Sequence, residues 1–125
     1  MQDLLVEKTY STPDIFFDAN TGLLQIKGES FPENVAKFYT PVMDWIKDYL
    51  NSTNREMKIE FEIVYFNSSS SKVFMTLFDM LDKEVGNGKK IAVKWRCDKE
   101  NETAIECGEE FKEDIRMLPF VIELF

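Results

Sequence analysis

Short apolar runs, separated by polar and turn-forming residues, occupy the first part of the chain, a pattern typical of β-strands. Residues 4–9 are one candidate strand, and residues 15–17 and 23–26 are two more. The residues that separate the last two, 18–22, are rich in turn formers. We therefore expect a β-hairpin close to the N-terminus.

Apolar residues next recur at intervals of three and four over residues 35–50, which predicts a helix with one buried face, ending near Asn51. Ser30, followed three residues later by Glu33, has the pattern of a capping box at the start of this helix. Pro41 lies within the segment. Because proline lacks a backbone N–H, we expect Pro41 to bend the helix or to separate its first turns from the rest.

Residues 57–66 predict a long strand, because apolar and polar side chains alternate through most of it. Its last residues, 63–66, are all apolar, which predicts a strand that is covered on both faces at that end. The strand ends at Asn67, and a run of four serines, residues 68–71, follows directly.

The remainder of the chain continues to alternate between the two kinds of element. Residues 73–81 repeat apolar side chains at helical spacing, and the turn 86–88 ends that helix. Residues 91–95 predict a strand, residues 101–113 a strongly acidic helix, and residues 120–124 a last strand.

These elements predict an α/β fold in one domain that spans residues 1–125. After residue 30, every passage from one strand to the next runs through a helix, and such passages favour parallel pairing with the helices packed on the sheet. We therefore expect a mixed sheet with an N-terminal β-hairpin and about three helices.

The composition supports one packed core, with 44% hydrophobic and 14% aromatic residues among 125. No stretch approaches the roughly 20 apolar residues that span a bilayer. The first residues lack the basic region and apolar run of a signal peptide. We expect a cytoplasmic protein that does not insert into membranes.

Histidine is absent from the chain, and this removes the commonest general base and the commonest transition-metal ligand. The two cysteines, Cys97 and Cys107, do not have the spacing of a zinc site and are too few for a disulfide framework. We expect two reduced, structural thiols and no metal or cofactor.

The net charge is −8, which argues against nucleic acid as a partner, because binding it requires a basic face. Residues 98–114 hold eight of the acidic residues against two lysines. This segment is interpreted as a solvated helix face. The alternative is an electrostatic docking surface for a basic partner.

The serine run is the strongest candidate for function, because it lies where a strand ends and a helix begins. Functional groups of α/β sheets gather at such carboxyl ends. One serine is enough to cap a helix, and four in a row followed by Lys72 exceed that need. Without a histidine or a G-x-S-x-G motif, none of the serines is expected to be a catalytic nucleophile, so we do not expect an enzyme.

Asp98 and Asn101 follow another predicted strand, so they could flank the serine site from a neighbouring strand end. The simpler interpretation is that Asp98 caps the acidic helix.

An ordered set of motifs along nearly the whole chain matches one known family. Residues 28–34 are similar to a G-x-S-Y-P-E-N signature, with Phe31 in place of the usual tyrosine. Residues 65–70 are similar to a Y-x-N-T/S-S-S motif. Further matches are Ser11-Thr12-Pro13 with Ile15, Gly22-Leu23-Leu24, Trp45, Tyr49-Leu50, Asp98, Asn101-Glu102, Gly108 to Asp114, and Pro119-Phe120. With this set the chain resembles the SiaC family of bacterial regulatory phosphoproteins.

The resemblance implies a STAS-like fold, similar to that of anti-sigma-factor antagonists, and a partner switch. In such a switch, a dedicated serine/threonine kinase phosphorylates the hydroxyl after the asparagine, and a PP2C-type phosphatase removes the phosphate. The unphosphorylated form engages a diguanylate cyclase and promotes cyclic-di-GMP synthesis. The modified hydroxyl corresponds to Ser68, where the family often has threonine, and Asn67, Ser69 and Ser70 flank it.

Two other functions remain open from the residues themselves. The chain could be a constitutive protein-interaction module whose serines only cap a helix. It could also bind a small molecule in the crevice at the strand ends.

Overall fold

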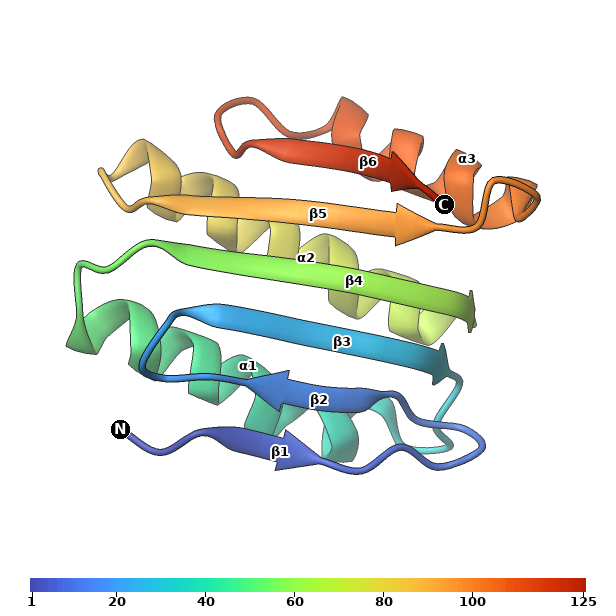
Figure 1. The fold of residues 1–125 in the computed structure, drawn as a ribbon, viewed down its shortest axis with the longest axis horizontal. Helices are drawn as coiled ribbons and strands as arrows, with labels where there is room; N and C mark the ends of the chain where they lie inside the picture. The colour runs from blue at the N-terminus through green and yellow to red at the C-terminus, as the bar shows by residue number, and fades with distance from the viewer.

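The computed structural model describes residues 1–125 as six strands and three helices. In chain order these are β1 (Leu4–Val6), β2 (Asp14–Phe17), β3 (Leu23–Ser30), α1 (Val35–Ser52), β4 (Met57–Phe66), α2 (Ser68–Gly86), β5 (Ile91–Cys97), α3 (Glu102–Glu113) and β6 (Phe120–Leu124). The predicted α/β fold is confirmed, with a mixed sheet, an N-terminal hairpin and three helices (Figure 1).

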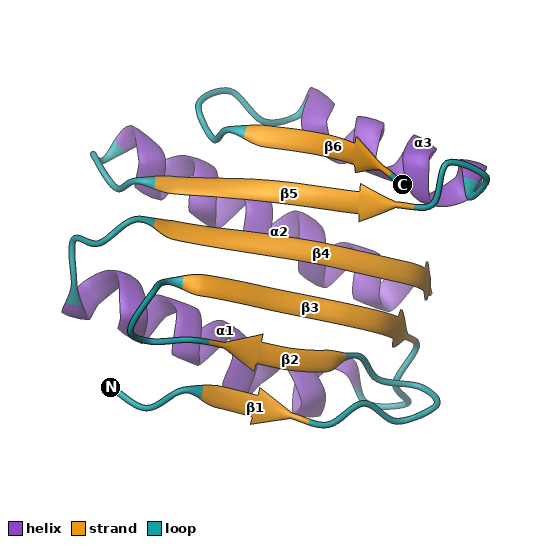
Figure 2. Cartoon of the chain, viewed as in Figure 1, coloured by secondary structure: helices purple, strands orange, loops and turns teal.

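The six strands lie in the sheet in the same order as in the sequence. β1, β2 and β3 pair antiparallel, and β3, β4, β5 and β6 pair parallel. The three helices form the connections between the parallel strands, and all three lie on one face of the sheet (Figure 2). None of the three helices is long and apolar enough to cross a membrane.

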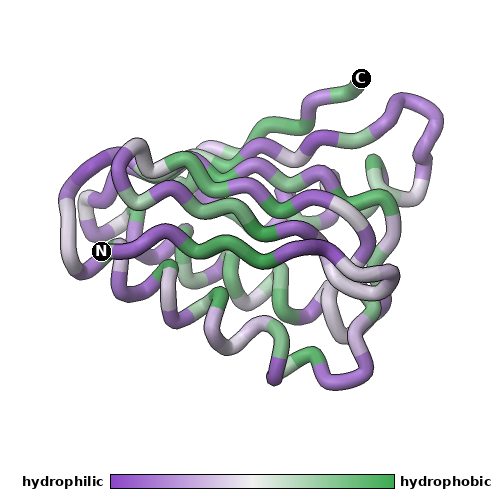
Figure 3. The backbone as a smooth tube through the Cα atoms, turned by 60° about the horizontal axis from the view of Figure 1, so that its bottom comes forward, coloured by the Kyte–Doolittle hydropathy of each residue, from purple (hydrophilic) through white to green (hydrophobic).

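The core lies between the helices and the sheet face that they cover. Along β4, for example, Met57, Ile59, Phe61 and Ile63 are buried on this face and alternate with charged residues. The same alternation of apolar and polar positions runs along the strands in Figure 3, where the helices lie beneath the sheet.

The opposite face of the sheet has no helix and carries ion pairs between neighbouring strands. Arg96 on β5 donates to Glu62 on β4 and, from Nε, to Glu123 on β6 at 2.9 Å. Lys94 lies 3.3 Å from Glu123, and Lys27 lies 3.7 Å from Glu62. Ion pairs therefore occupy the middle strands of this exposed face, and exposed apolar residues such as Phe16 and Val121 lie on its outer strands.

The prediction that residues 63–66 are covered on both faces is wrong. Val64 is 61% exposed and Tyr65 is 54% exposed. Val64 is exposed because it lies on the face without a helix. Tyr65 is exposed because of a β-bulge: Gly28 pairs with Ile63 but the next residue, Glu29, pairs with Tyr65, which leaves Val64 without a partner.

The capping box predicted for α1 is also wrong. Ser30 is the last residue of β3, and the N-cap of α1 is Asn34, whose side chain accepts from the Lys37 N–H at 3.0 Å. Pro41 does not separate the first turns, because α1 is continuous from Val35 to Ser52. Pro41 and Lys37 are exposed, so the Lys37 carbonyl that loses its helical partner faces water.

The end of α2 agrees with its predicted turn: the helix stops at Gly86, and Gly88 has a positive φ of 100°. Both cysteines are free, as predicted; Cys97 is buried and Cys107 is half-buried.

Candidate functional site

The carboxyl ends of β3 and β4 meet the start of α2 at one end of the sheet (Figure 1). Ser30 ends β3, Phe66 ends β4, and Asn67 is the N-cap of α2. The serine run is therefore the first turn of α2, at the position the sequence predicts.

Asn67 fixes this turn through three hydrogen bonds. Its Oδ1 accepts from the Ser70 N–H at 2.9 Å, and its carbonyl accepts from the Ser71 N–H at 3.0 Å. Its own N–H donates to the Ser30 carbonyl at 3.0 Å, which ties the start of α2 to the end of β3. The start of α2 is thus held without any serine hydroxyl in the capping position.

Ser70 belongs to a buried chain of three hydroxyls. Its Oγ lies 3.0 Å from the Ser30 carbonyl oxygen and 2.7 Å from the Ser30 Oγ, and the Ser30 Oγ is hydrogen-bonded to the Tyr39 hydroxyl. One arrangement satisfies all three bonds: the Tyr39 hydroxyl donates to Ser30, the Ser30 hydroxyl donates to Ser70, and the Ser70 hydroxyl donates to the Ser30 carbonyl. This chain joins β3, α1 and α2.

Burial dominates the electrostatics of that chain. It raises the pKa of Tyr39 to about 12, and the hydrogen bonds from Ser30 and Ser70 only partly oppose this rise. The phenol is therefore neutral at physiological pH and acts as a structural hydrogen-bonding group.

Burial distinguishes the four serines. Ser70 is fully buried and Ser71 is half-buried, whereas Ser68 and Ser69 are exposed. The Ser68 hydroxyl makes no hydrogen bond within the protein and belongs to the first residue of α2. Backbone N–H groups of a first helical turn lack helical acceptors and favour an anion nearby.

Asn101, one of the two residues predicted to flank the serine run, contacts the end of β4. Its Nδ2 donates to the Val64 carbonyl at 3.0 Å, which places the start of α3 beside the end of β4. Its Oδ1 accepts from the Ala104 N–H at 3.2 Å, so Asn101 is the N-cap of α3.

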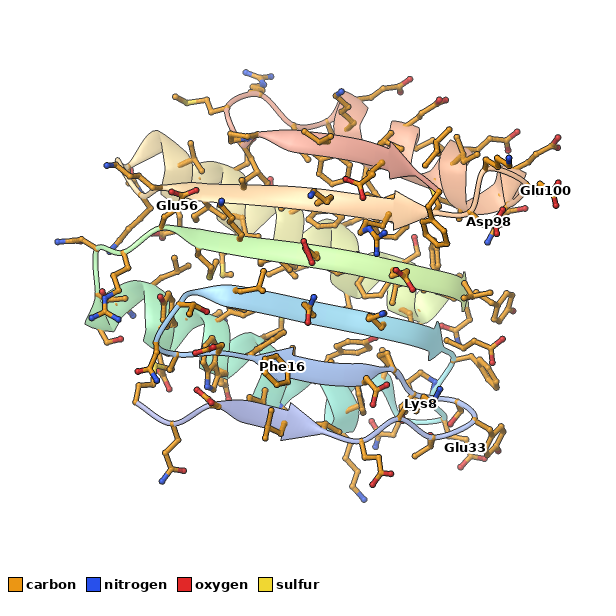
Figure 4. All side chains as sticks on the ribbon, in the orientation of Figure 1. Lys8, Phe16, Glu33, Glu56, Asp98 and Glu100 are labelled. Atoms are coloured by element: carbon orange, nitrogen blue, oxygen red, sulfur yellow. The ribbon has the colours of Figure 1, made fainter.

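The prediction that Asp98 caps α3 is therefore wrong. Asp98 accepts instead from the Glu100 N–H at 2.8 Å, within a turn that precedes the helix. The Asn101 N–H also donates to the Asp98 carbonyl and closes this turn. The cap of α3 therefore lies at Asn101, three residues after Asp98. Asp98 is exposed at the same end of the sheet (Figure 4). Its carboxylate makes no hydrogen bond to the serine run.

A groove of about 460 Å³ runs between α1 and α2 beside the exposed serines. Val35, Met43 and Val73 contribute apolar walls. Its polar lining includes Ser69, Asp44, Lys47 and Lys72, so the groove carries charges of both signs.

Neither cysteine has the features of a nucleophile. Burial raises the pKa of Cys97, and the charge of Asp98 adds to the effect. Burial also raises the pKa of Cys107, with smaller contributions from Glu110 and Glu106. No three His, Cys, Asp or Glu side chains come together as a metal site.

The sequence did not predict an exposed aromatic group beside the serine run. The ring of Phe31 lies 5.9 Å from that of Tyr10 and 5.7 Å from that of Tyr65, both in edge-to-face contact. Phe31 and Tyr65 each belong to one of the two main motifs of the family resemblance. That position was the one feature of the sequence that could have indicated the aromatic group.

Comparison with known proteins agrees with that resemblance. A family model described as SiaC family regulatory phosphoprotein matches residues 6–125. An uncharacterized protein of Pseudomonas aeruginosa strain UCBPP-PA14 is 35% identical over 123 residues, which are 98% of this chain and 97% of that protein.

Solved structures from Pseudomonas aeruginosa share the fold. A structure of SiaC has a TM-score of 0.93 and 33% identity, with all of both chains covered. A chain in the crystal structure of the diguanylate cyclase SiaD in complex with its activator SiaC has a TM-score of 0.94 and 34% identity, covering 98% of this chain and 100% of that chain. The family match over residues 6–125 and these relatives, about a third identical over nearly their whole length, show that this chain belongs to the SiaC family of regulatory phosphoproteins.

Proposed function

We propose that this chain is the phosphoprotein of a partner switch, with Ser68 as the modified residue. A cognate serine/threonine kinase phosphorylates Ser68 and a PP2C-type phosphatase removes the phosphate. The unphosphorylated form binds and activates a diguanylate cyclase. The observation that supports this most is the Ser68 hydroxyl, which is exposed, free of hydrogen bonds and located at the N-terminus of α2.

The position of Ser68 makes phosphorylation compatible with the fold. A phosphate adds about −1.5 to −2 charge at pH 7. An exposed negative charge at a helix N-terminus stabilises the helix by about 0.3–1 kcal/mol. Because Asn67 rather than Ser68 caps α2, the phosphate breaks no hydrogen bond that holds the helix.

The effect of the phosphate falls on binding instead. A cyclase surface that fits a neutral hydroxyl would have to bury an unpaired dianion, which costs several kcal/mol. Each 1.4 kcal/mol is a tenfold change in affinity, so this is enough to switch binding on and off.

In this proposal the chain acts by binding alone, without turnover of its own, in the cytoplasm and with a STAS-like fold. The complex of SiaD with its activator SiaC supports the cyclase as the kind of partner, since this chain and the matched chain are 34% identical.

Phosphopeptide mapping by mass spectrometry, after incubation with the cognate kinase, tests the site. We expect one phosphate on Ser68, its loss in Ser68→Ala, and normal labelling in the matched variant Ser69→Ala. A phosphate on Ser69 or Ser71 in the wild-type protein would overturn the choice of residue, and no phosphate at all would overturn the switch.

Binding measurements separate the switch from a constitutive interaction module. If Ser68→Asp and the phosphorylated protein bind every partner as tightly as the wild type does, the serines serve only the structure.

The groove between α1 and α2 gives a second candidate function, the binding of a small molecule. A thermal-shift screen with nucleotides and phosphates would reveal it as a rise in Tm that depends on ligand concentration. Lys72→Ala should then remove the rise.

A further inference from the structure

Four side chains form a continuous exposed surface at the carboxyl end of the sheet, which we call the aromatic edge: Tyr10, Phe31, Val64 and Tyr65. Tyr10 is 83% exposed, and Val64 and Tyr65 are more than half exposed. Phe31 is half-buried and contacts both tyrosine rings. The four residues come from three separate parts of the chain, so the fold assembles the surface.

The β-bulge in β4 creates this surface. In a regular strand Val64 and Tyr65 would point to opposite faces, and one of them would be buried. The bulge leaves both exposed and returns Phe66 to the core, where its ring lies 5.6 Å from that of Phe74. Bulges often re-aim side chains next to functional sites, and adjoining apolar side chains left in water often mark interaction surfaces.

A hollow of about 500 Å³ lies against the aromatic edge. It is lined by Lys8, Thr9, Tyr10, Gly28, Glu29 and Val64. It has room for an apolar side chain of a partner together with neighbouring atoms, with Tyr10 and Val64 as the apolar walls.

Acidic side chains surround the aromatic edge. Glu29 and Glu33 are exposed next to its β3 side. Asp98 and Glu100 lie at the same end of the sheet, as Figure 4 shows, and the bond from Asn101 to the Val64 carbonyl ties their turn to β4. Lys8 contributes a positive charge at the hollow.

We propose that the aromatic edge is the docking surface for a segment of the cyclase that presents an apolar side chain flanked by lysines or arginines. This inference rests on the proposed function and names the surface through which it works. Ser68, three residues after Tyr65, begins α2 at the same end of the sheet.

The charge distribution favours such a partner over a second copy of this chain. Each copy carries a net charge of −8 and would bring its own acidic rim against that of the other. A basic segment meets complementary charge. Each exposed ion pair at the rim adds little to the affinity, whereas a phosphate at Ser68 that is buried without meeting a cation in the complex opposes binding.

Affinity measurements with the purified cognate cyclase test the proposal. Tyr10→Ala and Tyr65→Ala should each weaken binding of the unphosphorylated protein by about tenfold or more, as expected for aromatic anchors. The matched control is Phe16→Ala, because Phe16 is an aromatic residue on β2 with 46% exposure and lies outside the aromatic edge (Figure 4). It should bind within about twofold of the wild type.

Salt dependence tests the basic character of the partner. Raising the ionic strength from about 0.01 M to about 0.15 M shortens the Debye length from about 30 Å to about 8 Å. The association rate should fall several-fold, and Glu33→Gln combined with Glu100→Gln should reduce both the rate at low salt and its salt dependence. An association rate independent of salt would overturn the proposal that the docking segment is basic.

The outcomes separate this inference from the proposed function. If Ser68→Asp abolishes cyclase binding while Tyr10→Ala and Tyr65→Ala bind normally, the docking surface is wrong and the switch stands. If the wild-type protein does not bind the cyclase, the proposed function is wrong and this inference fails with it. Sedimentation that shows a dimer in the wild type and a monomer in Tyr10→Ala would identify a second copy as the occupant instead.

Discussion

The four adjacent serines have different environments because successive residues of a helix point in directions about 100° apart. The buried side chains of α2 include Phe74, Leu77 and Leu81, at helical spacing. Counting back four residues from Phe74 gives Ser70, which explains why that hydroxyl faces the core while Ser68 and Ser69 face water.

The same reasoning applies to Ser30. It continues the inward positions of β3 after Leu24 and Ile26, since alternate residues of a strand share a face. The sequence therefore contained the signals for two members of the buried hydroxyl chain. The third, Tyr39, could be predicted only as a core residue, because its hydrogen bond depends on how α1 packs against β3.

Replacing each serine by alanine should reveal this difference. Ser70→Ala removes two buried hydrogen bonds and leaves polar partners unsatisfied, so we expect it to lower the free energy of unfolding by about 1–3 kcal/mol. Ser68→Ala should change it by less than about 0.5 kcal/mol, as for an exposed surface position. Urea unfolding followed by circular dichroism measures both. Equal effects would contradict the conclusion that the Ser70 hydroxyl is buried and structural whereas the Ser68 hydroxyl is exposed.

At the scale of whole elements, hydrophobic periodicity predicted the type of every strand and helix, whereas the caps of α1 and α3 were predicted wrongly. In both cases a serine or aspartate with capping chemistry lies before the helix, and an asparagine closer to it holds the cap. Ser30 instead forms buried hydrogen bonds at the end of β3, and the Asp98 carboxylate accepts a hydrogen bond within the turn before α3. The choice between capping a helix and making such other contacts depends on the folded structure, so it could not be predicted from the local sequence.

Close packing of α3 against β5 depends on Gly108. A Cβ there would lie 2.5 Å from the ring of Trp95, whose Nε1 is fixed by a 2.9 Å hydrogen bond to the Ala104 carbonyl. We expect Gly108→Ala to lower the free energy of unfolding by about 1–3 kcal/mol through overpacking.

The matched control is Gly86→Ala, because Gly86 also lies in a helix and its Cβ would meet only Met117 at an ordinary 3.5 Å. This variant should be neutral or more stable by about 0.5–1 kcal/mol, as alanine is the better helix former. Thermal unfolding should therefore show a lower Tm for Gly108→Ala and an unchanged or higher Tm for Gly86→Ala; a Gly108→Ala protein as stable as the wild type would show that α3 can move away from Trp95.

Asp82 joins α2 to the loop that leads into β6. Its carboxylate accepts from the backbone N–H groups of Arg116, Met117 and Leu118, at 3.1, 2.8 and 2.8 Å. The bonds from Met117 and Leu118 lower the pKa of Asp82 below its ordinary value of 3.8. The folded state therefore favours the ionised carboxyl.

The stability that Asp82 contributes should depend on pH in a defined direction. Because its pKa is lower in the folded state, the contribution is fully present above the unfolded pKa of about 3.9 and is lost as pH falls through the folded pKa. Asp82→Asn should destabilise the protein by about 1 kcal/mol at pH 7, a modest effect because solvent reaches and screens this half-buried carboxyl. Urea unfolding of both proteins should show the difference shrinking below about pH 4; a difference that stays constant with pH would mean that the charge of Asp82 is unimportant.

At the scale of the molecule, the order of the strands determines which face of the sheet is covered. From β3 to β6 each new strand is added on the same side of the previous one. Crossover connections between parallel strands are nearly always right-handed, so each of the three helices falls on the same face. The sequence predicted the crossovers, and the open face follows from them together with the strand order, which was not predicted.

The open face explains why a functional surface could form at the end of β4. Charged residues of the middle strands pair with one another there, as Arg96 does with Glu62 and Glu123. Beyond those pairs, Val64 and, because of the bulge, Tyr65 are exposed at the end of the sheet where Ser68 begins α2. One end of the sheet thus combines an apolar surface with an accessible hydroxyl, whereas ion pairs occupy the middle strands of the open face and single exposed apolar residues such as Phe16 lie on its outer strands.

Phosphorylation of Ser68 should leave the whole fold intact, since two small electrostatic effects on the phosphate oppose each other. The N-terminus of α2 attracts the phosphate by about 0.3–1 kcal/mol. The net charge of −8 repels it, but acidic groups farther away than about 8 Å are screened at physiological salt. The net change in the free energy of unfolding should therefore stay within about 1 kcal/mol, which for a domain of this size shifts Tm by less than about 6 °C.

Circular dichroism of the fully phosphorylated protein, with kinase-treated Ser68→Ala as the control, measures this outcome. α2 is the longest helix, with 19 residues, so its melting would cause a large loss of far-ultraviolet signal. An unchanged spectrum together with lost cyclase binding would show that the phosphate acts at the docking surface of a rigid domain. A collapsed spectrum would show instead that it acts by unfolding α2, and the roles of Asn67 as cap and of Ser70 as buried anchor would then be too weak to hold the helix.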